Sequence, residues 1–218
     1  MLAKETVDFL KRLDANNDRD WFNSNKAAFQ SANDNVIALT GELIGRIAKF
    51  DPEVGSLDPK SCVFRIYRDV RFSKDKSPYK TNLGAFIAPG GKKTMSPGYY
   101  FHIQPRMFFA AAGKHMPDAS ELLKIRNAVA TNTKEFLKIV EGGSFKKRFG
   151  ELDGDRLSRP PKGFDPEHPA IEYLKLKSFT VSEEFSSKDA LSKDYSKMLA
   201  DSFKAAYPLV VFLRKALG

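Results

Sequence analysis

Residues 62–80 read CVFRIYRDVRFSKDKSPYK, and the predicted fold is organised around this stretch. Over residues 62–72 apolar and polar side chains alternate, with Ile66 and Val70 on the apolar face. Alternation with a period of two is typical of a β-strand that is buried on one face. A run rich in Ser, Asp and Pro follows over residues 73–80 and favours a turn. We therefore predict a strand over 62–72 that leads into a tight turn.

The same stretch concentrates positive charge. Residues 65–80 contain six basic and two acidic residues, which makes +4 of the net +9 of the whole chain. Arginine presents a planar fork of donors that suits phosphate or carboxylate, and it stays charged at any working pH. The turn folds the lysines back toward the strand that carries the arginines. We therefore expect Arg65, Arg71, Lys76 and Lys80 to converge on one concavity that accepts an anion of two or more charges.

The aspartates of the stretch would orient the guanidinium groups, and tyrosine and histidine side chains would act as neutral donors. The candidate ligand-binding residues are Arg65, Arg68, Asp69, Arg71, Asp75, Lys76, Tyr79, Lys80 and His102. The alternative is a ladder of ion pairs on a solvated face, in which each pair contributes at most ~1 kcal/mol. No catalytic residue is predicted.

Arg68 departs from the alternation, because it shares parity with the apolar residues Phe64 and Ile66. An unpaired arginine on a core-facing side is very costly, so it needs a carboxylate or several carbonyl groups. Two interpretations stay open. Arg68 is either an internal structural tie that is largely buried, or a bulge re-aims it into a cavity.

The strand pattern continues after the turn. Residues 82–88, 98–104 and 107–112 read as three further strands with short links, and no helix separates them. Short links predict an antiparallel meander and argue against a parallel nucleotide-binding sheet. Residues 179–183 are a further short-strand candidate.

Helical patterns stand on both sides of this strand region. We expect Asn17 to cap a helix that runs to about Lys49, and residues 189–206 to form the last long helix. The predicted fold class is α+β: an antiparallel meander of about four or five strands packed with N- and C-terminal helices, in a single domain over 1–218.

Composition limits the remaining choices. The 218 residues are 42% hydrophobic, which is enough to build a substantial core. A single cysteine, Cys62, excludes intrachain disulfides and cysteine zinc sites, and it fits a reducing compartment. No segment approaches the roughly 20 apolar residues that a membrane helix needs. We expect a cytoplasmic protein with no membrane partner, and the sequence predicts no oligomeric state.

The sequence offers little support for a metal site, a phosphate loop or a dinucleotide site. The three histidines, His102, His115 and His168, lie far apart and show no metal-ligand spacing. The chain has neither a glycine-rich phosphate loop nor a dinucleotide fingerprint. We therefore predict no metal and no cofactor, and the sequence does not decide whether the protein is an enzyme.

The pattern RxxRDxRFSxDKxPYK over residues 65–80 resembles the signature of a widespread, mostly bacterial family of uncharacterised proteins, a domain of unknown function. Trp21-Phe22 and Gly98-Tyr-Tyr100 also resemble it, as does the connection over residues 161–164. The chain has Ala110-Ala-Ala112 where the family pattern has more glycine. The resemblance implies the position of a site and no activity.

Two hypotheses follow from the positive charge. The first is a pocket protein, with an enzyme as one form of it, that binds a small phosphorylated or polycarboxylated ligand at the arginine strand. The second is a module that follows a nucleic-acid backbone, with Lys92, Lys93, Arg106 and Lys146 to Arg148 extending the basic surface. A concave site favours the first hypothesis, and a flat basic stripe with exposed Tyr99 or Tyr100 favours the second.

Overall fold

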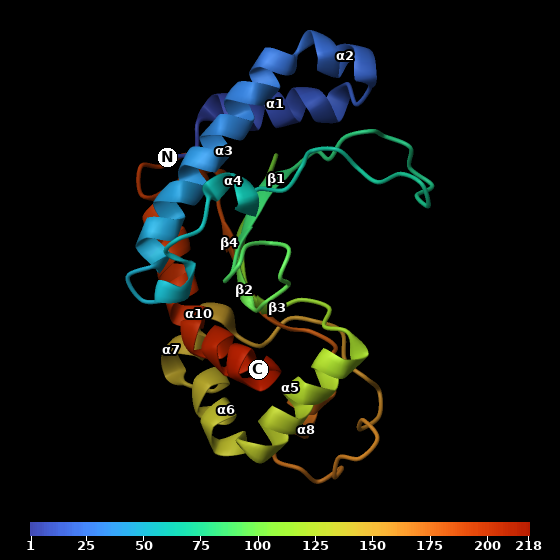
Figure 1. Ribbon diagram of the computed structural model, residues 1–218, viewed down its shortest axis with the longest axis vertical. Helices are drawn as coiled ribbons and strands as arrows, with labels where there is room; N and C mark the ends of the chain where they lie inside the picture. Colours follow the sequence, from blue (N-terminus) through green and yellow to red (C-terminus); the bar gives the residue numbers. More distant parts are fainter.

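The computed structural model describes residues 1–218, and its ribbon has the outline of a crescent (Figure 1). The elements are α1 (Lys4–Ala15), α2 (Arg19–Ser24), α3 (Lys26–Ile47), the 3₁₀ turn η1 (Pro52–Val54), α4 (Pro59–Cys62), β1 (Leu83–Ile87), β2 (Gly98–Gln104), β3 (Met107–Lys114), α5 (Ala119–Thr131), α6 (Thr133–Val140), α7 (Gly143–Phe149), α8 (Ile171–Leu174), β4 (Phe179–Phe185), α9 (Ser187–Ala190) and α10 (Tyr195–Leu217). Helices α1 and α2 lie at one end of the crescent, and α5 to α8 lie at the other. The sheet lies between them.

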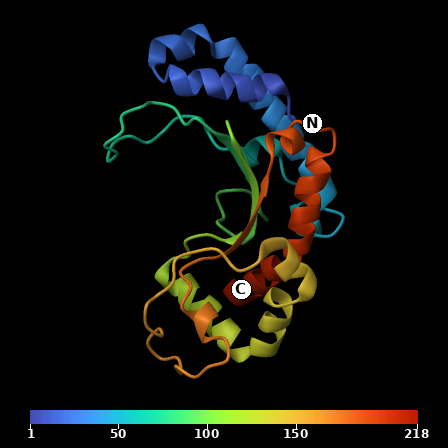
Figure 2. The ribbon, with the colours of Figure 1, turned by 180° about the vertical axis from the view of Figure 1, so that it is seen from behind.

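The sheet is an antiparallel meander of four strands in the order β1-β2-β3-β4, which confirms the predicted α+β class. In its register Ala85 faces Phe101, and Phe101 faces Ala110. The side chains of Tyr99, Phe101 and Ile103 are fully buried on one face, which α3 and α10 cover. Seen from behind, the same two helices run along the outer side of the crescent (Figure 2). The other face of the sheet is turned toward the inner side.

The predicted strand over 62–72 is wrong. Cys62 ends the short helix α4, and residues 63–82 form an extended arm that leaves the sheet and passes below α1 and α2 (Figure 1). Isolated bridges join Val63 to Ala85 and Tyr67 to Tyr79, but no continuous ladder forms. The fourth strand of the sheet is instead β4, at the position of the short-strand candidate.

The arm leaves the sheet because its alternating apolar residues do not share a buried face. Ile66 is 2% exposed and belongs to the core, whereas Phe72 is 97% exposed. Pro78 has no N–H group to donate, so the ladder between the two sides of the arm cannot continue through it. Two backbone hydrogen bonds remain near the base, from Arg68 N to Pro78 O and from Lys80 N to Ile66 O.

The expected N-terminal helix is also divided. Asp18, and not Asn17, caps α2, because the Asp18 carboxylate accepts from the Trp21 N–H at 2.8 Å. The helix then breaks at Asn25, and α3 follows. Asn17 has another role: its side chain donates to Tyr79 O at 3.0 Å and accepts from Tyr79 N at 3.1 Å. This pair of bonds ties the arm to the first helices.

One cluster of 48 buried residues joins the helices and the sheet. It contains a buried polar contact, in which the Tyr99 hydroxyl donates to Asp51 Oδ2 at 2.8 Å and Arg214 Nη1 donates to Asp51 Oδ1 at 3.0 Å. Burial, followed by the Asp51 charge, raises the pKa of Tyr99. None of the helices is long and apolar enough to cross a bilayer.

Candidate functional site

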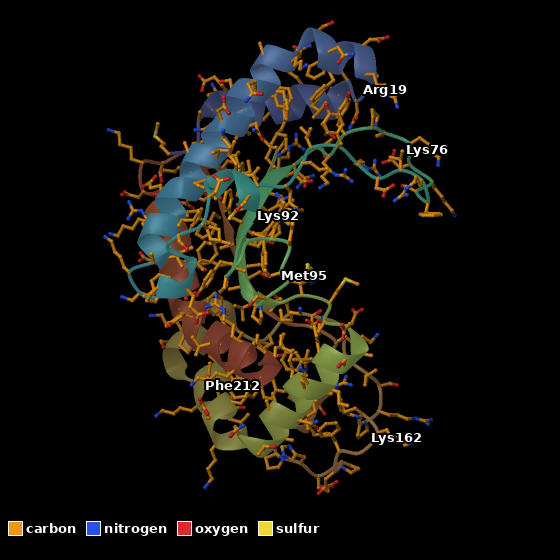
Figure 3. The ribbon with its side chains drawn as sticks, viewed as in Figure 1. Arg19, Lys76, Lys92, Met95, Lys162 and Phe212 are labelled. Atoms are coloured by element: carbon orange, nitrogen blue, oxygen red, sulfur yellow. The ribbon has the colours of Figure 1, made fainter.

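An open groove of about 630 Å³ lies at the base of the arm, between α3, α4 and the turn before β2. Four of the side chains that line it are cations, and one is a carboxylate. The lining residues are Gln30, Asn33, Asp34, Ile37, Lys60, Val63, Phe64, Arg65, Lys80 and Lys92. Figure 3 shows Lys92 beside α4 near the base of the arm and Lys76 at the far tip. We call this space the basic groove.

Two cations of the basic groove lie over one aromatic ring. Lys80 Nζ lies 5.5 Å and Lys92 Nζ lies 6.0 Å from the centre of the Phe64 ring, so both ammonium groups meet its electron-rich face. Lys92 also donates to the Val63 carbonyl. Burial lowers the pKa of Lys80, and the nearby charges of Arg65 and Lys92 lower it further. The charged form of Lys80 is therefore less favoured than in an exposed lysine, and a nearby anion would favour it again.

No carboxylate neutralises this cluster. Lys60, Arg65, Lys80 and Lys92 form no ion pair within 4.0 Å. The one acidic side chain of the groove, Asp34, accepts from Gln30 Nε2 at 2.9 Å. The groove therefore carries an excess of positive charge.

A second groove, of about 360 Å³, lies on the other side of the arm. Its lining is almost entirely polar, and Lys80 belongs to both grooves. The residues are Asp14, Asn17, Arg68, Asp75, Ser77, Tyr79, Lys80, Thr81 and Asn82. The space therefore combines two carboxylates with two cations, so its charges compensate one another.

Arg68 forms an ion pair with Asp75 in this second groove and also donates to Ser73 Oγ at 3.4 Å. The hydrogen bonds from Ser77, followed by that from Arg68, lower the pKa of Asp75 well below its usual range. The expected carboxylate partner is present, but the Arg68 side chain is 26% exposed and so is not largely buried. Arg68 therefore ties the two sides of the arm together.

The other predicted residues do not share one concavity. At the tip, Arg71 pairs with Asp69 through two hydrogen bonds of 2.9 and 2.7 Å, and Lys76 donates to Val70 O at 3.0 Å. Tyr79 is buried and stacks on Phe22, with ring centres 3.9 Å apart. Of the nine predicted residues, the structure brings only Arg65 and Lys80 into the basic groove.

His102 lies on the inner face of the sheet, in a row with Tyr100 and Gln104. Its Nδ1 is 2.9 Å from the Tyr100 hydroxyl and its Nε2 is 3.0 Å from Gln104 Oε1, and its ring stacks on Phe109. Burial lowers the pKa of His102, although the Gln104 contact acts against this. The row reaches the basic groove through the Tyr100 ring, which meets Phe64 edge to face at 6.0 Å.

Sequence reasoning did not assign Lys60, Lys92, Gln30 and Asn33 to this site. Lys92 follows Gly90 and Gly91, whose φ angles of 73° and 80° turn the chain back toward the arm. The two glycines indicate a turn, but its direction depends on where α4 and the arm lie. No group of three or more His, Cys, Asp or Glu side chains lies close enough together to hold a metal ion.

A family model described as "Conserved hypothetical protein (DUF2461)" matches residues 5–212. The chain belongs to the DUF2461 family. The region that matches DUF2461 includes the arm and every residue that lines the two grooves. No curated protein and no solved structure matched this DUF2461 chain.

Proposed function

We propose that this DUF2461 protein binds a small anion of two or more charges, phosphorylated or polycarboxylated, in the basic groove. The observation that carries the proposal is the pair of Lys80 and Lys92 over the Phe64 ring, with Arg65 lining the same groove and no carboxylate paired with any of the three. Like charges held close together destabilise the folded state unless an opposite charge neutralises them. An anion in the groove supplies that charge.

The shape of the groove supports a small ligand. Its volume of about 630 Å³ lies within the roughly 300–1,000 Å³ that is typical of small-molecule sites. Lys60 approaches from α4, Lys92 from the turn and Lys80 from the arm, so the cations come from three separate segments. Donors that converge from several directions suit a compact anion better than an extended chain.

The nucleic-acid alternative has weaker support. A backbone-binding surface needs a continuous row of free cations, and aromatic rings on which bases stack. Arg71 at the tip is engaged by Asp69, and Tyr99 is fully buried against Asp51.

We also propose a cytoplasmic location. Cys62 is a buried free thiol whose pKa is raised by burial, and a reducing compartment keeps such a thiol unpaired.

Thermal unfolding in different salts tests the proposal. Phosphate should raise the melting temperature of the wild-type protein more than chloride does at matched ionic strength, because it binds the folded state specifically. Lys92→Gln should lose this difference. Lys93→Gln is the matched control, since it removes the same charge from the next, exposed residue.

Equal stabilisation of all three proteins by both salts would contradict the proposal and indicate general screening of charge. Binding of short oligonucleotides that weakens steeply with salt, with no preference for phosphate over chloride, would favour the nucleic-acid alternative.

A further inference from the structure

The basic groove has an apolar wall as well as its cations. Ile37, Val63 and Phe64 line it together with Lys80 and Lys92. Phe64 is 37% exposed, although a ring of this size is usually buried in a protein core. We infer that the groove takes a nucleotide-class ligand, in which a planar heteroaromatic ring is joined to phosphate. This inference deepens the proposed function and rests on it.

Phe64 can stack with such a ring once the ammonium groups of Lys80 and Lys92, which lie over its face, move onto the phosphate of the ligand. Tyr100 meets Phe64 edge to face from the inner face of the sheet, with an interplanar angle of 68°. Lys80 and Lys92 lie 5.5 and 6.0 Å from the centre of the Phe64 ring. A phosphate bound between the two ammonium groups is therefore beside the Phe64 ring. A planar group attached to that phosphate is therefore close enough to contact the Phe64 ring.

Polar side chains of α3 stand across the groove from these cations. Gln30, Asn33 and Asp34 lie on the exposed side of that helix and line the same space. An amide side chain both donates and accepts, and the carboxylate accepts, so together they can match the mixed donors and acceptors on the edge of a nucleobase. An inorganic anion or a polycarboxylate could accept hydrogen bonds from these amides, but it would not use the aromatic ring or the acceptor groups of α3.

A free nucleotide and the end of a nucleic acid both carry a phosphate joined to a heteroaromatic ring. The structure favours the free nucleotide, because the cations of the arm tip lie outside the groove and Arg71 is paired with Asp69. The groove therefore has one anion-binding cluster and no continuous track for a second or third phosphate along a strand.

Isothermal titration calorimetry with four probes tests the inference: adenosine 5′-diphosphate, inorganic pyrophosphate, adenosine and a 5′-phosphorylated single-stranded decanucleotide. Base stacking on an aromatic side chain predicts that the wild-type protein binds the diphosphate nucleotide about 5- to 100-fold more tightly than pyrophosphate. Adenosine should bind more weakly than either anion, because it lacks the phosphates. The decanucleotide should bind no more tightly than the free nucleotide.

Variants of Phe64 separate the ring from the charge. Phe64→Leu keeps an apolar side chain but removes the stacking surface, so it should lose at least about fivefold in nucleotide affinity while pyrophosphate affinity changes by less than about twofold. Phe64→Tyr keeps the ring and should retain nucleotide binding. Phe72→Leu is the matched control, because it removes an exposed ring that lies outside the groove.

The outcomes distinguish this inference from the proposed function. Equal affinity for nucleotide and pyrophosphate, or equal losses in Phe64→Leu, would overturn the nucleotide inference and leave the anion site in place. Binding of neither anion by the wild-type protein would overturn both. A decanucleotide that binds much more tightly than the free nucleotide, and depends on Phe64, would overturn the choice of source.

Discussion

Lys80 has a distinct position among the basic residues, because it lies between the two grooves at the base of the arm. It lines both of them, and its ammonium group faces the Phe64 ring. Burial is the largest cause of its lowered pKa, and the charges of Arg65 and Lys92 add to it. A lysine in this setting loses its proton at a lower pH than an exposed lysine does. An anion in the basic groove would reverse this effect.

The Lys80 pKa predicts how pH acts on the protein. Without an anion, the free energy of unfolding contributed by this group should rise as pH rises through the lowered pKa, since the unfolded state then binds the proton more tightly. Phosphate affinity should fall over the same alkaline range, below the ordinary lysine value of 10.5. Lys80→Arg should keep its phosphate affinity there, because arginine stays protonated. A parallel loss in both proteins, measured by calorimetric titration, would assign the effect to another group.

At the scale of an element, the arm over residues 63–82 is attached to the rest of the protein mainly at its base. Ile66 enters the core, Tyr79 stacks on Phe22, and the Asn17 side chain bonds both backbone groups of Tyr79. Beyond these contacts the charged residues of the tip pair with one another. The lysines and arginines of the signature pattern therefore serve two purposes, because some shape the arm and others line the basic groove.

Asn17→Ala tests this attachment. It removes two hydrogen bonds and leaves the partly buried Tyr79 N–H and carbonyl groups without partners, so the free energy of unfolding should fall by about 1–3 kcal/mol. Trypsin should also cleave faster after Lys74 and Lys76. Urea unfolding and limited proteolysis measure the two effects.

The neighbouring Asn16→Ala is the control for this experiment. Asn16 makes one exposed side-chain hydrogen bond, to Arg12 O. Asn16→Ala should therefore lower the free energy of unfolding by less than about 1 kcal/mol and leave the trypsin cleavage rate unchanged. Equal effects of the two substitutions would mean that Asn17 does not anchor the arm.

At the scale of the whole molecule, the long helix α10 runs along the crescent from its middle, beside α3, to the end formed by α5 to α8 (Figure 1). It packs on α3 and β3 near its start and on α5, α6 and α7 further along. Arg214, in its last turn, forms an ion pair with the buried Asp51 at 2.9 Å and donates to Pro97 O at 3.0 Å. This contact ties the C-terminal helix to the segment that follows α3.

Arg214→Met should lower the free energy of unfolding by about 3–5 kcal/mol, because it leaves the Asp51 charge buried without its partner. Arg46→Met is the matched control, since Arg46 pairs with Glu42 on an exposed helix face. Its loss should cost less than about 1 kcal/mol. Chemical unfolding that shows similar losses for both would contradict a structural role for the buried pair.

The sequence by itself determined the α+β class, three strands of the meander and the helices on either side. These predictions depend on local information: the alternation of Tyr99, Phe101 and Ile103 is a period of two within one segment, and short links allow only antiparallel neighbours. The signature pattern also indicated the segment that contributes Arg65 and Lys80 to the basic groove.

Only the tertiary structure decided which segment completes the sheet and which cations meet. Residues 62–72 carry a strand-like pattern, yet β4, which begins about 65 residues after the end of β3, takes the edge position beside β3. Alternation records which side chains can share a face, but burial also requires a partner surface, and Phe72 has none. The positions of Lys60 and Lys92 in the basic groove could not be predicted either. Their approach depends on packing between distant segments, and such packing leaves no local pattern in the sequence.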